Sequence, residues 1–366
     1  MSWPLIVTAA AVLVVLVAIF VLAPKLGRHT QHGHRKDVSL AVTNQSSISH
    51  ARDSKFYYKF TMNEGIPFIR IHLQSQPSQP FLCVLDSGSA DLNVASPECG
   101  YCDGAHGAYV SNVKGMRTTL AYGTQTDTVI KKQDGLYLTS DTSATGAVSD
   151  IDVHVTVART KDSSNFNVFG ISQVGFMRNL LNNRALLISF HWHSMGGFVT
   201  SITADQASVY RDCALAHAPL VRLPSLPFYI IRLTAIKIGG ISVPSPRYCI
   251  IDTGSNVISV PPQTFDALVP HIRESAPLEV IFGTAGPAAK KENVETDSND
   301  GKIVVPHVNY TFFSQLMIDD DVPDFGVGSM MVLGCNGMMN HSFIFERNHL
   351  SVVRSNANVC EGVHRV

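Results

Sequence analysis

The stretch CVLDSGS (83–89) is followed much later in the chain by a near copy, CIIDTGS (249–255). In each copy a Cys and two aliphatic residues lead into an Asp, a small hydroxyl residue, Gly and Ser. A single Asp-Ser-Gly triplet is typical of a β-turn, because all three residues favour turn conformations. Two copies in the same apolar context predict that Asp86 and Asp252 end interior strands, where an unpaired carboxylate would be costly.

Short runs rich in Val, Ile, Phe, Tyr and Thr surround both copies, and Gly, Pro, Asp or Ser separate them. Such runs are typical of β-strands bounded by turns. Only two segments, residues 174–187 and 261–272, have the apolar spacing or the leading prolines of a helix. The second half repeats the order of the first, with strands, an acid at a strand end, a helix and further strands. We therefore predict an all-β fold with a few short helices.

The composition indicates a globular body without a strongly charged partner. The chain has 366 residues, and 45% of them are hydrophobic, which is enough for a sizeable core. Its formal net charge of −1 gives no electrostatic reason to expect a nucleic-acid partner or an acidic substrate. We expect residues 53–212 and 213–366 to form the two halves of this body, each with one copy of the acidic loop.

The N-terminal residues 1–23 differ from the rest of the chain. Residues 3–23 carry no charge and are long enough to cross a bilayer as a helix. A cleaved signal peptide and an uncleaved anchor are both open, and the missing basic n-region and the long apolar run favour the anchor. Residues 24–52 are polar and basic, which is typical of a stalk or a short pro-segment. The positive-inside rule would keep that side cytosolic, whereas long domains translocate largely regardless of flanking charge.

The chain has seven cysteines, and they bear on the compartment. Cys99-Gly-Tyr-Cys102 could form a redox pair or half of a zinc site, but no second CxxC exists, so a small loop-closing disulfide is favoured. A disulfide and the N-glycosylation sequons at Asn44, Asn309 and Asn340 favour a lumenal or extracellular body on a single-pass membrane anchor. The pairing of five cysteines stays open: Cys83, Cys213, Cys249, Cys335 and Cys360.

The two acidic loops predict a reaction if the fold brings them together. Two adjacent carboxylates cannot easily both ionise, so Asp86 and Asp252 would share one proton. The ionised acid can then take a proton from water while the protonated acid donates one to a substrate carbonyl. Gly88 and Gly254 would let the backbone turn tightly beside the acids. Ser87 and Thr253 can form hydrogen bonds across the pair of loops. The hydroxyl side chains expected to support the loops are Ser87, Ser89, Thr253 and Ser255.

On these motifs the chain resembles the pepsin-like aspartic peptidases, over roughly residues 54–355. That family has one D-[ST]-G triplet in each lobe, which matches Asp86-Ser87-Gly88 and Asp252-Thr253-Gly254. The resemblance implies a bilobal fold with the acids between the lobes and a small disulfide loop at Cys99 and Cys102. It also implies a substrate-binding β-hairpin, the flap, with Tyr122-Gly123-Thr124 at its tip. The family's two apolar-apolar-Gly triplets, which pass beside the acidic loops, match residues 168–170 and 332–334.

The resemblance further implies an endopeptidase that hydrolyses extended polypeptides with a water molecule activated between two carboxylates. Such an enzyme uses no metal and no cofactor, and it is expected to have an acidic pH optimum. A retroviral-style homodimer is disfavoured because one chain already carries both acids, so a monomer is expected.

Three residues depart from the family's pattern. Asn93 stands where the family usually has Trp, which removes the customary hydrogen-bond partner of Tyr122. Asp91 stands in the place of an Asn, and Cys335 in the place of an Asp. These changes leave an alternative function open, a catalytically inactive, membrane-tethered binding protein on the same scaffold. The two retained acids favour the enzyme.

Overall fold

The computed structural model describes the chain between residues 56 and 355, with gaps. The predicted anchor (1–23) and basic segment (24–52) lie outside the described residues and stay predictions. Within the described ranges, no helix is long and apolar enough to span a bilayer. The described residues are 56–110, 114–122, 125–140, 147–160, 166–181, 184–191, 194–222, 226–272, 276–282, 301–305, 313–315 and 330–355.

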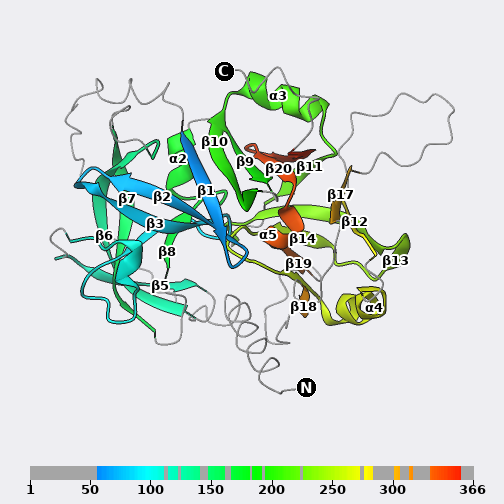
Figure 1. The fold of residues 1–366 in the computed structure, drawn as a ribbon, viewed down its shortest axis with the longest axis horizontal. Coiled ribbons are helices and arrows are strands. Elements are labelled where there is room, and N and C mark those ends of the chain that lie inside the picture. Colours follow the sequence, from blue (N-terminus) through cyan, green and yellow to red (C-terminus); the bar gives the residue numbers. More distant parts are fainter. Residues whose placement is uncertain are drawn as a thin grey trace, which may run out of the picture.

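Most of the described chain is β-structure, which confirms the predicted all-β class with a few short helices (Figure 1). The strands up to residue 221 are β1 (Tyr57–Asn63), β2 (Ile66–Leu73), β3 (Gln76–Asp86), β4 (Leu92–Ala95), β5 (Arg117–Tyr122), β6 (Gln125–Tyr137), β7 (Ala147–Arg159), β8 (Asn167–Gly170), β9 (Ala185–His191), β10 (Gly196–Ile202) and β11 (Ala216–Val221). The later strands are β12 (Tyr229–Ile238), β13 (Ile241–Val243), β14 (Tyr248–Ile251), β15 (Ile258–Val260), β16 (Leu278–Phe282), β17 (Gly301–Val305), β18 (Phe313–Gln315), β19 (Met330–Leu333), β20 (His341–Phe345) and β21 (His349–Arg354).

The helical elements in the described residues are short: η2 (Gly104–His106), α2 (Phe176–Leu181), α3 (Ala204–Asp212), α4 (Pro262–Ile272) and α5 (Cys335–Met338). α4 confirms the helix expected over 261–272. It begins with Pro262, a residue suited to the first helical turn, and it buries Thr264, Leu268 and Ile272 at four-residue intervals.

The helix expected over 174–187 is too long. The helix α2 ends at Leu181, and the residues from Ala185 onward form strand β9. β9 pairs with β10 on one side and with β20 on the other. The apolar run at 185–190 therefore lies inside a sheet, and these long-range pairings override the local helical spacing.

One strand arrangement occurs twice and sets the position of each acid. β3 ends at Asp86 and runs parallel to β8, which in turn pairs antiparallel with β4. β14 ends just before Asp252 and runs parallel to β19, which pairs antiparallel with β15. β8 thus lies between β3 and β4, and β19 lies between β14 and β15. In both cases the loop with the acid connects the two outer strands of the three. In Figure 1, β2, β3 and β5–β8 gather on the left, and β12–β14 and β17–β19 on the right.

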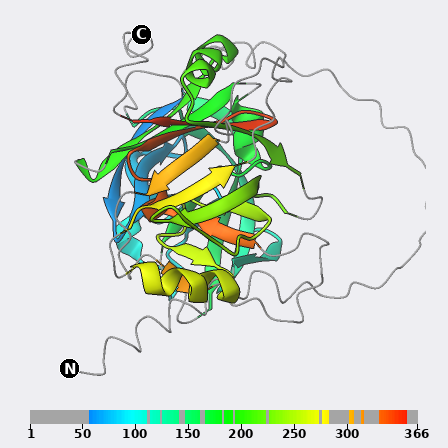
Figure 2. The ribbon, with the colours of Figure 1, turned by 90° about the vertical axis from the view of Figure 1, so that its right-hand side faces the viewer.

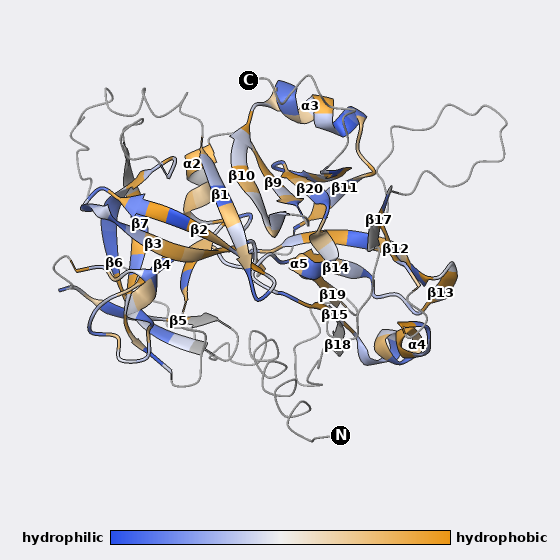
Figure 3. Cartoon of the chain, viewed as in Figure 1, coloured by the Kyte–Doolittle hydropathy of each residue, from blue (hydrophilic) through white to orange (hydrophobic). Residues whose placement is uncertain are grey.

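A sheet made from distant parts of the chain joins these two groups of strands. Its pairings run from β2 to β1, β10, β9, β20, β21, β11 and β12. Figure 2 shows the red C-terminal strands beside the green strands from the middle of the chain, with α3 above them. α3 buries only Ala207 and Tyr210 against this sheet, and it accordingly shows mixed hydropathy in Figure 3. The shared sheet holds both acid-bearing groups in one body.

Candidate active site

Asp86 is the last residue of β3, and Asp252 directly follows β14. Leu85 and Ile251, which precede the acids, are completely buried, as expected for strands that run parallel to a neighbour inside a sheet. Asp86 and Asp252 themselves are only half-buried, so part of each residue remains accessible from outside. Each acid therefore lies where the end of a buried strand meets the accessible surface.

The two acidic loops hold each other through reciprocal hydrogen bonds. Ser87 N–H donates to Thr253 Oγ1 (2.9 Å), and Thr253 N–H donates to Ser87 Oγ (2.8 Å). Each hydroxyl then donates to the carbonyl before the other acid, Ser87 Oγ to Ile251 (2.8 Å) and Thr253 Oγ1 to Leu85 (2.6 Å). All four bonds are buried, where a lost partner is expensive. The sequence predicted bonds across the loops from these two hydroxyls, and the structure contains them.

The two carboxyl groups lie side by side. A Cβ atom built on Gly88 would lie 2.8 Å from Asp252 Oδ1 and 3.1 Å from Asp86 Oδ1, and one on Gly254 would overlap the Asp86 carboxylate. Gly88 and Gly254 therefore serve close approach between the loops. Neither has the positive φ that a tight-turn glycine often has. The expected tight turns are present, with Ser89 N–H bonded to Asp86 O (3.4 Å) and Ser255 N–H to Asp252 O (3.3 Å), and the glycines are needed there because a side chain would collide with the acids.

The pKa of Asp252 is raised well above its ordinary range. Burial is the largest cause, followed by the nearby charge of Asp86 and a hydrogen bond between the two side chains. The N–H groups of Gly254 and Gly88 act in the opposite direction because they stabilise the carboxylate. The net effect keeps a proton on Asp252 at a pH where an exposed aspartate would be ionised. The pair can therefore hold one proton and one negative charge together.

The hydrogen bonds around the pair are not symmetric. Asp86 Oδ1 accepts the N–H of Gly88 (2.8 Å), and its Oδ2 accepts the hydroxyl of Ser89. Asp252 Oδ1 accepts the N–H of Gly254 (2.9 Å), but the hydroxyl of Ser255 donates to the carbonyl of Val257 (3.3 Å). Asp86 accepts one more hydrogen bond that stabilises a negative charge than Asp252 does, so the proton of the pair is favoured on Asp252.

Two further glycines let a strand end pass directly beside each loop. Gly170 donates its N–H to Asp91 O (2.9 Å), and a Cβ there would lie 2.6 Å from Ser89 O. Gly334 donates to Val257 O (3.0 Å), and a Cβ there would lie 2.7 Å from Ser255 O. These are the final residues of the two apolar-apolar-Gly triplets, and each packs directly against the loop that carries an acid.

Cys335 follows the second of these glycines and lies close to both acids. Its Sγ donates to Thr253 O (3.1 Å), and the residue is completely buried. Burial raises the pKa of this thiol far above its ordinary range, and the charges of Asp252 and Asp86 raise it further. Cys335 is therefore a neutral neighbour of the acid pair. The sequence marked it as a departure from the family's pattern but did not place it against the acids.

The strands of the expected flap form a hairpin. β5 and β6 pair antiparallel from Arg117 opposite Ile130 to Tyr122 opposite Gln125. Gly123 and Thr124, the other two residues expected at the tip, lie outside the described residues. The position of the hairpin relative to the acid pair stays a prediction.

The expected disulfide between Cys99 and Cys102 is confirmed, with an S–S distance of 2.07 Å. Cys213 also forms a disulfide, which the sequence left open. Three other cysteines have free thiols, and all are buried: Cys83, Cys249 and Cys335. Cys360 lies outside the described residues.

Sequence reasoning missed a buried ion pair between Asp127 and Arg159 in the first group of strands. Arg159 lies at the end of a strand-like run and Asp127 near the start of another, and no local pattern in the sequence indicates that they meet. The described part of the chain contains no cluster of three or more His, Cys, Asp or Glu side chains that could hold a metal ion.

Neither a protein-family model nor a curated protein sequence matches the chain, so these comparisons assign it no family.

Proposed function

We propose that the chain is an aspartic endopeptidase with the bilobal pepsin-like fold, in which residues 53–212 and 213–366 form the two lobes. One observation carries the proposal. Asp86 and Asp252 lie side by side at the ends of two equivalent buried strands, and the hydroxyls of Ser87 and Thr253 lock their loops together. The repeated strand arrangement around each acid supports the bilobal fold.

In the proposed reaction Asp86 acts as the base and Asp252 as the acid. The Asp86 carboxylate, which accepts hydrogen bonds from Gly88 and Ser89, removes a proton from a water molecule between the two side chains. The water oxygen attacks the peptide carbonyl carbon while the proton of Asp252 passes to the carbonyl oxygen. The resulting tetrahedral intermediate breaks its C–N bond as the nitrogen takes the proton from Asp86, and one of its two hydroxyl groups returns a proton to Asp252 as the carbonyl re-forms. No covalent bond to the enzyme forms, and the pair ends with the one proton that it had at the start.

The proposed substrate is an extended polypeptide. A hairpin that closes over a strand-like peptide excludes water and aligns the scissile bond, and β5 and β6 supply a hairpin in the group of strands that carries Asp86. Backbone hydrogen bonds would then give affinity, and pockets for alternate side chains would give specificity.

Incubation with a mixed peptide library from about pH 3 to about pH 7 tests this function, because the pair requires a shared proton. We expect cleavage at acidic pH that a statine-type inhibitor suppresses, with sites read by mass spectrometry. Absence of cleavage, insensitivity to the inhibitor, or a rate that keeps rising above neutrality would each contradict the enzyme. Binding of the inhibitor without any cleavage would support the alternative of an inactive binding protein.

Substitution of Ser89 by Ala is expected to move the acidic limb of the pH profile of kcat/KM upward by about one pH unit. The Ser89 hydroxyl bonds to the charged form of Asp86, so its loss disfavours ionisation of the pair. A hydrogen bond to a charged group contributes about 1.5–3 kcal/mol, and one pKa unit corresponds to about 1.4 kcal/mol. The profile measured on one cleaved peptide checks this shift.

Ser255→Ala provides the matched control. Ser255 occupies the same position in the second loop, but its hydroxyl donates to Val257 O and not to the acid. The acidic limb should therefore stay within about 0.3 pH units of the wild type. Equal shifts in the two variants would show that the hydrogen-bond asymmetry does not control the pair.

A further inference from the structure

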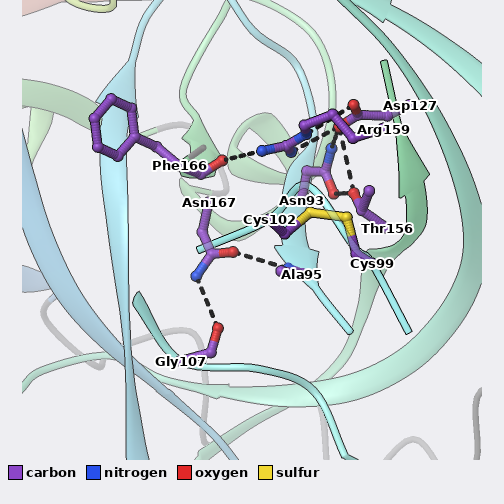
Figure 4. Close-up of a disulfide and its surroundings, with 10 residues drawn as sticks. All are labelled: Asn93, Ala95, Cys99, Cys102, Gly107, Asp127, Thr156, Arg159, Phe166 and Asn167. Atoms are coloured by element: carbon purple, nitrogen blue, oxygen red, sulfur yellow. Dashed lines mark hydrogen bonds and ion pairs between the residues drawn. A yellow bond between two sulfur atoms is a disulfide. The ribbon is translucent and has the colours of Figure 1, made fainter. Parts of the chain in front are cut away.

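A fully buried ion pair connects strand β6 to strand β7. Arg159 Nε lies 2.9 Å from Asp127 Oδ1 and Arg159 Nη2 lies 2.8 Å from Asp127 Oδ2, so the contact is bidentate (Figure 4). Asp127 is 0% exposed and Arg159 5% exposed. Such a pair has a fixed mutual orientation, because the guanidinium and the carboxylate match at two points. Burying it is costly, and apolar side chains would serve stability equally well.

Two neutral side chains complete a network around the Asp127 carboxylate. Asn93 Nδ2 donates to Asp127 Oδ2 (3.0 Å), and Thr156 Oγ1 donates to Asn93 Oδ1 (2.5 Å). Thr156 Oγ1 also lies 3.3 Å from Asp127 Oδ2. Figure 4 shows these four side chains converging from three strands near the Cys99–Cys102 disulfide. Asn93 and Thr156 are both completely buried, so the network is shielded from water.

The strands in this network link the hairpin to the first acidic loop. Asp127 lies opposite Leu120 of β5, a short distance along β6 from the hairpin tip. Asn93 belongs to β4, the strand that follows the Asp86 loop, and it lies opposite Val168 of β8. The hydrogen bond from Asn93 to Asp127 therefore connects the strand after the acid to strand β6 of the hairpin, near its tip.

Asn93 takes the place at which the resemblance leads one to expect a Trp that bonds to the hairpin Tyr. In this chain the residue at that place still contacts the hairpin, but it does so through a buried charge. A charge inside the sheet fixes geometry more strictly than an apolar contact, because every donor and acceptor must stay paired. The network has the properties expected of an anchor for the hairpin.

We propose that Asn93, Asp127 and Arg159 are positioning residues that hold the β5–β6 hairpin in its substrate-binding orientation relative to Asp86. The inference rests on the proposed peptidase function, since it assigns the hairpin to substrate binding. The residues touch neither the acid pair nor the substrate, so they act through the hairpin. Their loss should weaken peptide binding and leave the proton chemistry of the pair unchanged.

Two measurements on Asn93→Ala test the proposal. In hydrogen exchange, the backbone amides of 117–122 and 125–130 should exchange about tenfold faster than in the wild type. In kinetics with a cleaved peptide, KM should rise about tenfold, kcat should fall less than about threefold, and the pH dependence of kcat should be unchanged. A purely structural residue would not separate KM from kcat in this way.

Asn167→Ala is the matched control. Asn167 is as deeply buried as Asn93, and its side chain bonds to Ala95 N (2.8 Å) and His106 O (2.9 Å), away from the hairpin. Asn167→Ala removes a buried side-chain amide, as Asn93→Ala does, so the melting temperature should fall in both variants. Hairpin hydrogen exchange and KM should stay at the wild-type values in Asn167→Ala.

Thr156 supplies a second test if Asn93→Ala does not fold. Thr156→Val removes the hydroxyl that orients Asn93 and keeps the side-chain shape, whereas Thr156→Ser keeps the hydroxyl. The Val variant should reproduce the faster hairpin exchange and the higher KM, and the Ser variant should restore both. Failure of Ser to restore them would overturn the proposal.

The proposal is also overturned if hairpin exchange in Asn93→Ala and Thr156→Val equals that of the wild type, or if KM does not change although peptides are cleaved. If the wild type cleaves no peptide, it is the proposed function that fails. Hydrogen exchange then decides alone whether the network anchors the hairpin, because that measurement needs no activity.

Discussion

Replacement of Asp252 by Asn is expected to lower kcat by about 10⁴-fold, equivalent to about 5 kcal/mol of the activation barrier, without loss of the fold. Asn has nearly the same shape as Asp, and its side-chain oxygen can still accept the N–H of Gly254. An amide cannot, however, give a proton to the carbonyl oxygen and recover it from water. Steady-state hydrolysis of a peptide at the wild-type optimum measures the loss.

Two companion variants make this result specific to the pair. Asp86→Asn should be as inactive as Asp252→Asn, and the double variant should be hardly worse, because residues that act as one unit are not additive. Asp91→Asn makes the same chemical change at a partly exposed acid, which lies 3.4 Å from His154 Nδ1 and outside the pair. It should retain activity within about threefold. An Asp252→Asn enzyme with more than about 1% of wild-type activity would exclude the shared-proton mechanism.

The stability of Asp252→Asn gives a readout that does not depend on activity. The folded-state pKa of Asp252 is raised above its ordinary value of 3.8, so the folded chain binds more protons than the unfolded chain above that pH. The free energy of unfolding of the wild type therefore falls as the pH rises from about 3.8 through the folded-state pKa. Asn does not titrate, so its melting temperature should match the wild type near pH 4 and exceed it near pH 7. A lower melting temperature for Asp252→Asn than for the wild type at neutral pH would mean that charge on the acid pair does not destabilise the folded wild type.

The sequence predicted the features that depend on short, repeated patterns. The strands that end at Asp86 and before Asp252 follow from apolar triplets before a turn, and the helix α4 follows from its leading prolines and spacing. The sequence left the adjacency of the two loops conditional on the fold, and the family resemblance implied it; the structure places the two carboxyl groups side by side. The bonds of Ser87 and Thr253 belong to the same inference. Local patterns thus account for most of the candidate site.

The features that the sequence did not predict depend on pairing between strands, which local spacing does not show. Residues 185–187 have helical spacing but become part of β9, because they pair with the adjacent strand β10 and with β20, which follows more than 150 positions later. Arg159 and Asp127 are charged residues in strand-like runs, and such residues are ordinarily placed on a solvated face. Only the cross-strand register of β6 and β7 puts them opposite each other inside the sheet. Cys335 likewise reaches the acids because β19 ends beside β14.

Substitution of Thr253 by Val is expected to destabilise the protein by about 2–6 kcal/mol and to abolish measurable hydrolysis. The hydroxyl of Thr253 accepts Ser87 N–H and donates to Leu85 O, and both partners are buried. Val fills nearly the same volume but leaves these two backbone groups unpaired, at about 1–3 kcal/mol each. The loops would separate to reach water, which would move the two carboxyl groups apart. Thermal or urea unfolding and the peptide assay measure the two effects.

The matched substitutions separate the loss of the hydroxyl from the loss of packing. Thr253→Ser keeps both hydrogen bonds and loses one methyl group, so it should cost only about 1 kcal/mol and keep most of the activity. Thr264→Val on α4 removes a single, partly buried hydrogen bond to Pro244 O (2.7 Å), and it should cost about 1 kcal/mol with unchanged kcat. Ser87→Ala should destabilise the protein as much as Thr253→Val, within about 1 kcal/mol, because the two hydroxyls have equivalent partners. The double variant should lose less stability than the sum of the two single variants, because both hydroxyls hold the same two loops together. Strict additivity of Ser87→Ala and Thr253→Val would mean that the two hydroxyls act separately, and the acid pair would then lack the mutual support on which its geometry depends.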